Sequence, residues 1–262
     1  MRRRLFLLPA MLAAIPAAAQ DRDYCPARPG LGEPACTMAP GQVSVEIGAI
    51  AWERSDDSGT RTDLLTIADS LIRVGVTDTA EVSIAWAPYL RESTRDPGGV
   101  TTEQGSSDVT LAFKQNLRSP DGTGFAVALE PHLTLPVAGM PGGARDWSAG
   151  LVVPASFDLG HDLAFQSTSE ADAATDADRH GRHLALGEVV GLGIALGGSL
   201  SATGEVELVR DWDPAGATTQ AYAGIAFGLA VSDDLQLDAG AVAGLDAAAS
   251  DVQLYAGIAR RF

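Results

Sequence analysis

The feature that most constrains this chain is a period-two alternation of apolar and polar residues that runs through most of its length. In the first such segment Val43, Val45 and Ile47 share one face, whereas Ser44 and Glu46 share the other. Successive side chains of a β-strand point to opposite faces, so this alternation predicts strands. Turn residues such as Gly-Gly and Asp-rich pairs separate the segments. The sequence therefore predicts an all-β chain.

The number and spacing of these segments predict a closed barrel. Counting them gives about twelve strands, and single-chain bacterial barrels have an even number. Short turns alternate with longer polar stretches such as 55–61 and 93–104, as periplasmic turns alternate with external loops in membrane barrels. We therefore predict a transmembrane antiparallel up-and-down β-barrel over residues 41–262, with strands at 41–54, 62–76, 80–92, 105–117, 124–137, 145–158, 162–172, 182–196, 199–211, 217–231, 234–246 and 250–262.

The first residues predict export from the cytoplasm. Three arginines at 2–4 precede the apolar run 5–14, and Ala17, Ala18 and Ala19 form a small-residue cleavage site. This pattern is typical of a signal peptide, here residues 1–19. No later stretch approaches the roughly 20 uninterrupted apolar residues of a membrane helix. A membrane crossing would then require a closed barrel, and we expect the outer membrane of a Gram-negative bacterium.

Residues 20–40 are expected to form a periplasmic N-terminal segment ahead of the barrel. Both cysteines, Cys25 and Cys36, lie in this segment, which is rich in Pro and Gly. An oxidising periplasm favours a disulfide between them. Two free thiols in a flexible tail are the alternative. No further Cys or nearby His completes a zinc site.

The charge of the chain restricts its partners and suggests the character of its lumen. The net charge is −16, with 34 acidic against 18 basic residues, which excludes a nucleic-acid partner because phosphate neutralisation needs clustered Lys and Arg. Charged side chains are costly at the lipid midplane, about 2–4 kcal/mol for Lys or Arg. We expect an acidic lumen that disfavours anions. An equal alternative is that these charged side chains form salt bridges with one another and fill the lumen of a plugged barrel. The lumen-lining candidates are Glu46, Lys114, Glu130, His132, Glu170, Glu205, Glu207 and Asp238.

Two features do not fit the simple pattern. Glu188 falls on the same face as Leu186 and Val190, and a bulge near Gly187 is expected to correct this. Four prolines also fall in expected strands, where they cannot donate to the hydrogen-bond ladder. We expect bulges or strand ends at Pro88, Pro131, Pro136 and Pro154.

The histidines provide no clear catalytic or metal site. His132 lies mid-strand among the lumen candidates, without the serine or aspartate spacing of a triad. His180 and His183, with Asp176 and Asp178, resemble half a metal site, but a solvated acidic loop is the simpler interpretation. We therefore predict no enzyme, no cofactor and no metal.

The last segment is typical of a strand that closes an outer-membrane barrel. An alternating strand with a final aromatic residue resembles the recognition signal of the barrel-assembly machinery. A soluble sheet that ends on Phe by chance is the alternative. Arg260 is the exception on the apolar face, and near the membrane rim it can extend to the head groups. That face otherwise comprises Val252, Leu254, Ala256, Ile258 and Phe262.

Several short motifs carry a family resemblance over the mature chain. They are Tyr24-Cys25-Pro26-Ala27-Arg28-Pro29-Gly30 with Ala35-Cys36-Thr37, Asp108-Val109-Thr110-Leu111, Asn116-Leu117 before the Pro120-Asp121-Gly122 turn, Leu133-Thr134-Leu135-Pro136 and Tyr255-Ala256-Gly257-Ile258-Ala259-Arg260-Arg261-Phe262. On these motifs the chain resembles the outer-membrane transporter family linked to phenol-degradation meta-pathways. The resemblance implies a barrel that passes small, often aromatic or hydrophobic compounds. It transfers no binding residues.

The sequence therefore favours an outer-membrane channel for small organic solutes, with outer-membrane lipid and the barrel-assembly machinery as its other partners. Three alternatives remain open: an outer-membrane enzyme, a structural barrel with a plugged lumen, and a soluble periplasmic barrel that binds a ligand. The sequence leaves the oligomeric state open.

Overall fold

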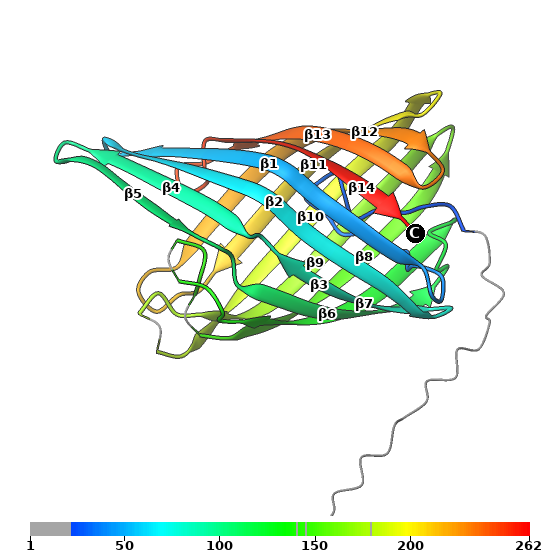
Figure 1. The fold of residues 1–262 in the computed structure, drawn as a ribbon, viewed down its shortest axis with the longest axis horizontal. Helices are drawn as coiled ribbons and strands as arrows, with labels where there is room; N and C mark the ends of the chain where they lie inside the picture. Colours follow the sequence, from blue (N-terminus) through cyan, green and yellow to red (C-terminus); the bar gives the residue numbers. More distant parts are fainter. Residues whose placement is uncertain (1–21, 140, 145, 179) are drawn as a thin grey trace, which may run out of the picture.

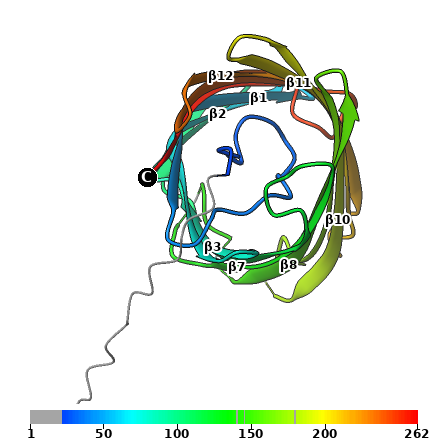
Figure 2. The same cartoon turned by 90° about the vertical axis from the view of Figure 1, so that its right-hand side faces the viewer.

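The computed structural model describes residues 22–139, 141–144, 146–178 and 180–262, so the expected signal peptide at 1–19 lies outside the described residues. One antiparallel sheet of 14 strands closes on itself because β1 pairs with both β14 and β2. Figures 1 and 2 show this barrel in two perpendicular views. The strands are β1 (Val43–Asp57), β2 (Thr60–Thr77), β3 (Ala80–Trp86), β4 (Tyr89–Asp96), β5 (Gly99–Gly105), β6 (Val109–Arg118), β7 (Phe125–Leu135), β8 (Ser148–Gly160), β9 (Leu163–Thr175), β10 (Arg182–Gly197), β11 (Leu200–Asp211), β12 (Thr218–Ser232), β13 (Leu235–Gly244) and β14 (Val252–Arg261).

The wall is a twelve-stranded circuit in which two strands are each interrupted once. β3 and β4 both pair with β2, and only Ala87 and Pro88 separate them. β5 pairs with β4 and β6 pairs with β3, with a break over residues 106–108. The predicted antiparallel barrel of about twelve strands is thus confirmed, and the two breaks account for the two extra strands.

The distribution of charged and apolar side chains is the reverse of that in a water-soluble protein. Inside the barrel, Arg73, Glu46 and Glu81 are 1%, 0% and 1% exposed, whereas Leu208 and Leu254 on the outer wall are 51% and 48% exposed. Buried charges surrounded by an apolar outer surface are expected when lipid is the external solvent. Among the described residues, no helix has the length and apolar character needed to cross a membrane. The predicted transmembrane barrel is confirmed by this inside–outside pattern.

Two of the expected long loops are instead extended hairpins. β1 and β2 remain paired as far as Asp57 and Thr60, and β4 and β5 as far as Asp96 and Gly99. These hairpins extend past the rest of the wall at the left of Figure 1. Their residues are polar on both faces, so they lack the apolar alternation from which strands are predicted. The expectation of loops at 55–61 and 93–104 was therefore wrong.

Glu188 needs no bulge to be accommodated. β10 keeps a continuous register with β9 and β11 through Gly187, so Glu188 stays on the outer face and the expected bulge was wrong. Its carboxylate accepts hydrogen bonds from Ser167, at 2.6 Å, and from Ser169 on the adjacent strand β9. Hydrogen bonds from neighbouring side chains lower the cost of a polar group on this surface.

The prolines divide into two pairs. Pro88 and Pro136 lie just outside strand ends, as expected. Pro131 and Pro154 instead lie inside β7 and β8 without a bulge, and they keep their partners on one side, Leu151 and Thr168 respectively. On the other side the ladder omits the proline positions and resumes in the same register. A missing N–H therefore interrupts the hydrogen bonds locally without shifting the strand.

Candidate functional site

Residues 22–42, which precede β1, run inside the barrel (Figure 2, blue), and we call them the plug. Its central residues Ala35, Cys36 and Ala39 are almost completely buried. A disulfide joins Cys25 to Cys36, as predicted. The plug has no secondary structure of its own in the described residues, so its position depends on contacts with the wall.

The plug lies at the end of the barrel where the short turns gather, which we call the turn end. The backbone N–H of Thr37 donates to the carbonyl of Pro120 between β6 and β7, at 3.0 Å. The guanidinium of Arg22 donates to the carbonyl of Asp78 between β2 and β3, at 2.7 Å. The opposite end, with the longer connections, we call the loop end.

Two ion pairs connect the plug to opposite parts of the wall. The guanidinium of Arg28 lies 2.9 Å from a carboxylate oxygen of Asp238 on β13. The ammonium of Lys114 on β6 lies 3.2 Å from the carboxylate of Glu33. The wall partner of each pair is buried, since the side chains of Asp238 and Lys114 are 0% and 2% exposed, so each pair lies in a place where charges are only weakly screened. The plug is therefore fixed across the lumen.

Wall carboxylates also accept hydrogen bonds from the plug backbone. Glu205 accepts from the N–H groups of Leu31 and Gly32, at 2.8 and 3.1 Å. Glu46 accepts from the N–H groups of Ala27 and Arg28, each at 3.1 Å. A buried chain without secondary structure must find partners for its N–H groups. The acidic lumen provides those partners.

Arg73 on β2 links the wall to the disulfide. Its guanidinium lies 2.9 Å from Glu81 and 3.2 Å from Glu46. The same group donates to the carbonyls of Cys25, at 2.8 Å, and Cys36, at 3.5 Å. Arg73 and Glu81 are not among the lumen residues predicted from the sequence, although both fall on the inward face of their strands. The alternation of inward and outward side chains along β2 and β3 was the signal that could have identified them.

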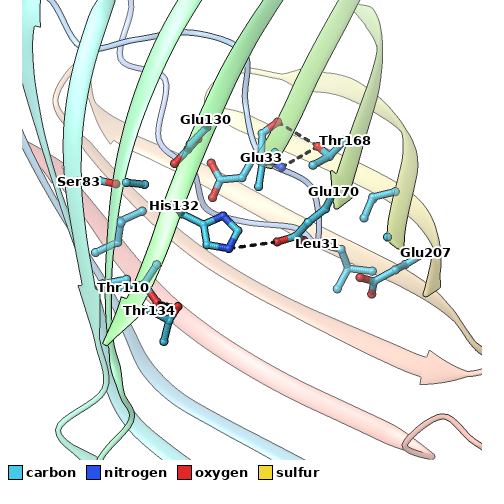
Figure 3. Close-up of a pocket in the computed structure, with 16 residues that line it drawn as sticks. Leu31, Glu33, Ser83, Thr110, Glu130, His132, Thr134, Thr168, Glu170 and Glu207 are labelled. Carbon is cyan, nitrogen blue, oxygen red and sulfur yellow. Dashed lines mark hydrogen bonds and ion pairs between the residues drawn. The ribbon is translucent and has the colours of Figure 1, made fainter. Parts of the chain in front are cut away.

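Next to the plug the lumen holds a cavity of about 440 Å³, shown in Figure 3. Leu31 and Glu33 of the plug form one side of it, and residues of β2, β3 and β6 to β11 form the rest. His132 lies in its wall, with Nε2 3.1 Å from Asp172 Oδ1 and 4.0 Å from Glu170 Oε1. Hydroxyl, carboxylate, imidazole and aliphatic groups all reach the cavity.

A family model with the description "Putative MetA-pathway of phenol degradation" matches residues 27–262. The chain belongs to this family. The match begins within the plug and runs through the last strand, so this family model covers the plug from residue 27 onward as well as the barrel. The family resemblance stated from the sequence is confirmed.

Solved structures share the barrel architecture of this family member at low sequence identity. The beta domain of the Bordetella autotransporter BrkA matches with a TM-score of 0.53 and 15% identity, over 85% of this chain and 100% of that chain. The KdgM porin in complex with disordered oligogalacturonate matches at 0.50 and 8%, over 84% and 99%. The CymD monoaromatic hydrocarbon channel matches at 0.44 and 11%, over 85% and 88%. No curated protein sequence matches the chain. These likenesses concern the fold alone.

The structure places the eight lumen candidates of this family member in two groups. One group, Glu130, His132, Glu170 and Glu207, lines the cavity. The other group contacts the plug and comprises Glu46, Lys114, Glu205 and Asp238. Lys114 connects the groups, since its Nζ also lies 3.0 Å from Glu130. Since Lys114 is already engaged by carboxylates, the cavity is left with an acidic excess.

Proposed function

We propose that this barrel is an outer-membrane channel through which small organic solutes pass by way of the cavity beside the plug. The observation that carries the proposal is the cavity of about 440 Å³ that lies inside the barrel, between the plug and the inward face of the wall. A cavity of this size is within the range that holds small organic molecules. The family description directs attention to phenol degradation, so aromatic compounds are the first solutes to test.

The proposal includes the route to the membrane. We expect residues 1–19 to act as a cleaved signal peptide and the mature chain to enter the outer membrane of a Gram-negative bacterium. The apolar outer wall supports a lipid partner. We expect neither catalysis nor a cofactor. A hydrolytic activity lost on substitution of His132 would instead favour an outer-membrane enzyme.

One specific observation favours a second candidate function. The plug is held to several parts of the wall by ion pairs and hydrogen bonds, which is the arrangement expected of a structural barrel whose lumen is closed. The two functions differ in solute flux. Liposome swelling separates them, because a closed barrel passes no solute of any size.

The acidic cavity predicts cation preference. Glu170→Gln with Glu207→Gln should reduce the preference for cations over anions, because two carboxylates facing the cavity lose their charge. The measurement is the reversal potential of the purified protein in a planar bilayer under a salt gradient. Glu188→Gln is the matched control, since Glu188 hydrogen-bonds on the outer wall, and it should leave the reversal potential unchanged. Anion preference in the unaltered protein would refute an acidic pathway.

Phe262 is proposed to be part of the assembly signal. Its N–H donates to the carbonyl of Val43 at 2.8 Å, and the residue is 66% exposed. The guanidinium of Arg260 lies 4.8 Å from the centre of its ring, so the ring is accessible for recognition while the backbone joins the last strand to β1. Deletion of Phe262, or Phe262→Ala, should reduce the heat-modifiable barrel in outer-membrane fractions while export continues. Phe262→Tyr should restore assembly. Normal assembly of Phe262→Ala would contradict a role for the ring.

A further inference from the structure

A compact group of one histidine and three aspartates lies at the loop end, on the far side of the barrel from the plug. It joins two connections: Asp176 follows β9, and Asp213 follows β11. Asp213 accepts a hydrogen bond from the N–H of Ala177 at 2.7 Å, so the two connections are held together. His183, near the start of β10, lies between them.

The imidazole of His183 is buried, with 5% of its side chain exposed. Its Nδ1 lies 2.9 Å from Asp176 Oδ1 and 3.6 Å from Asp213 Oδ2. On the other side of the ring, Nε2 lies 2.9 Å from Asp211 Oδ1 but makes no well-directed hydrogen bond within the described residues. The ring therefore has one carboxylate on its Nε2 side and two on its Nδ1 side.

The charges of this group are not balanced by the side chains of the described residues. Among the described residues, His183 is the one basic side chain in ion-pair distance of Asp176, Asp211 and Asp213. The carboxylate of Asp213 accepts hydrogen bonds from the N–H groups of Ala177 and Ala215, each at 2.7 Å, which fix its position. Within the described part of the chain, three carboxylates around a single imidazole leave an excess of negative charge that a divalent cation would neutralise.

We infer that Nδ1 of His183 and the carboxylates of Asp176 and Asp213 form a binding site for one divalent transition-metal ion of the Zn²⁺ type. The candidate donor atoms of these three residues lie within 4.8 Å of one another. Ligands of a tetrahedral Zn²⁺ ion are roughly 3.3 Å apart, given bonds of about 2.0–2.1 Å, and the two distances to Nδ1 bracket this value. Mixed nitrogen and oxygen donors suit such an ion better than Ca²⁺, which takes oxygen ligands.

Asp211 has a positioning role in this arrangement. A histidine that binds a metal through one ring nitrogen usually donates the other N–H to a carboxylate, which fixes the ring. Asp211 lies on the Nε2 side at 2.9 Å, where it would accept that proton. Gly181 completes the site, because a Cβ there would lie 2.6 Å from Asp176 Oδ2. The ion would hold the two connections together at the loop end.

The test is calorimetric titration of the mature protein in detergent with Zn²⁺ after removal of metal by a chelator. The unaltered protein should bind one Zn²⁺ per barrel, and Zn²⁺ should raise the thermal unfolding midpoint. His183→Gln and Asp213→Asn should each abolish saturable binding. Asp211→Asn should weaken it by about 10–100-fold, the range for partners of ligating histidines.

The matched control uses the other histidine and aspartate in the connection after β9. His180 and Asp178 are 87% and 72% exposed and lie outside the group, so His180→Gln with Asp178→Asn should leave binding unchanged. If His183→Gln does not fold, Asp213→Asn in the β11–β12 connection provides the decisive comparison. Absence of saturable binding, or equal binding by the unaltered protein and Asp213→Asn, would overturn the inference and leave His183 as a charged clasp between the two connections.

Discussion

Removal of the plug, residues 22–42, is expected to raise the single-channel conductance of the barrel several-fold. The plug crosses the lumen at the turn end, and its contacts include Asp238, Lys114 and Glu205. The wall closes without it, because β1 pairs directly with β14 and β2. The measurement is conductance in planar bilayers, with the shortened chain fused directly after the signal peptide.

A milder variant provides the control for this deletion. Cys25→Ser with Cys36→Ser removes the disulfide but leaves the contacts of Arg28 and Glu33 in place, so its conductance should lie close to that of the unaltered protein. Heat-modifiable migration shows whether each variant has formed a barrel. Equal conductance of the folded deletion variant and the unaltered protein would mean that the plug does not limit passage.

Replacement of Arg73 by Met is expected to cause the largest loss of stability of any single lumen substitution considered, about 3–5 kcal/mol. Met occupies similar space but leaves Glu46 and Glu81 without the guanidinium they share. Carbonyls of both disulfide cysteines lose a donor as well. The measurement is the free energy of unfolding in urea, followed by gel migration of the folded and unfolded forms.

A matched substitution on the same strand separates buried from exposed charge. The side chain of Arg61 on β2 is 39% exposed and pairs with Asp63 at 2.9 Å, so Arg61→Met should cost no more than about 1 kcal/mol. Adding Glu46→Gln and Glu81→Gln to Arg73→Met should recover part of the loss, since the uncompensated charges are removed. An equal loss of unfolding free energy in Arg73→Met and Arg61→Met would show that the buried ion pairs of Arg73 do not stabilise the barrel more than an exposed pair does.

The wall of the barrel could be predicted because lipid outside and water inside impose opposite requirements on alternate residues. The resulting alternation along each strand predicted that Glu130, Glu170 and Glu207 point inward, and it would have predicted the same for Arg73. It failed where strands are polar on both faces, as in the tip of β4 and β5. It also failed at Glu188, where two serines on the adjacent strand accommodate a carboxylate.

The plug and the histidine group could not be predicted from local pattern. Arg28 and Asp238 are 210 residues apart in sequence, and the plug has no periodicity from which its path could be read. The sequence indicated a segment with a disulfide, but it contained no signal that this segment enters the lumen. His183 likewise meets Asp211 and Asp213 through the pairing of β10 with β11, which only the register of the folded wall determines.

Liposome swelling with the purified mature protein tests the central claim most directly. The solutes form a series of neutral polar compounds of increasing size, compared between the unaltered protein and the variant without residues 22–42. A channel narrowed by its plug predicts that the unaltered protein passes the smallest solutes and that the deletion variant also passes larger ones. If the unaltered protein passes no solute of any size while the deletion variant does, the plug seals the lumen and the proposed channel function is contradicted.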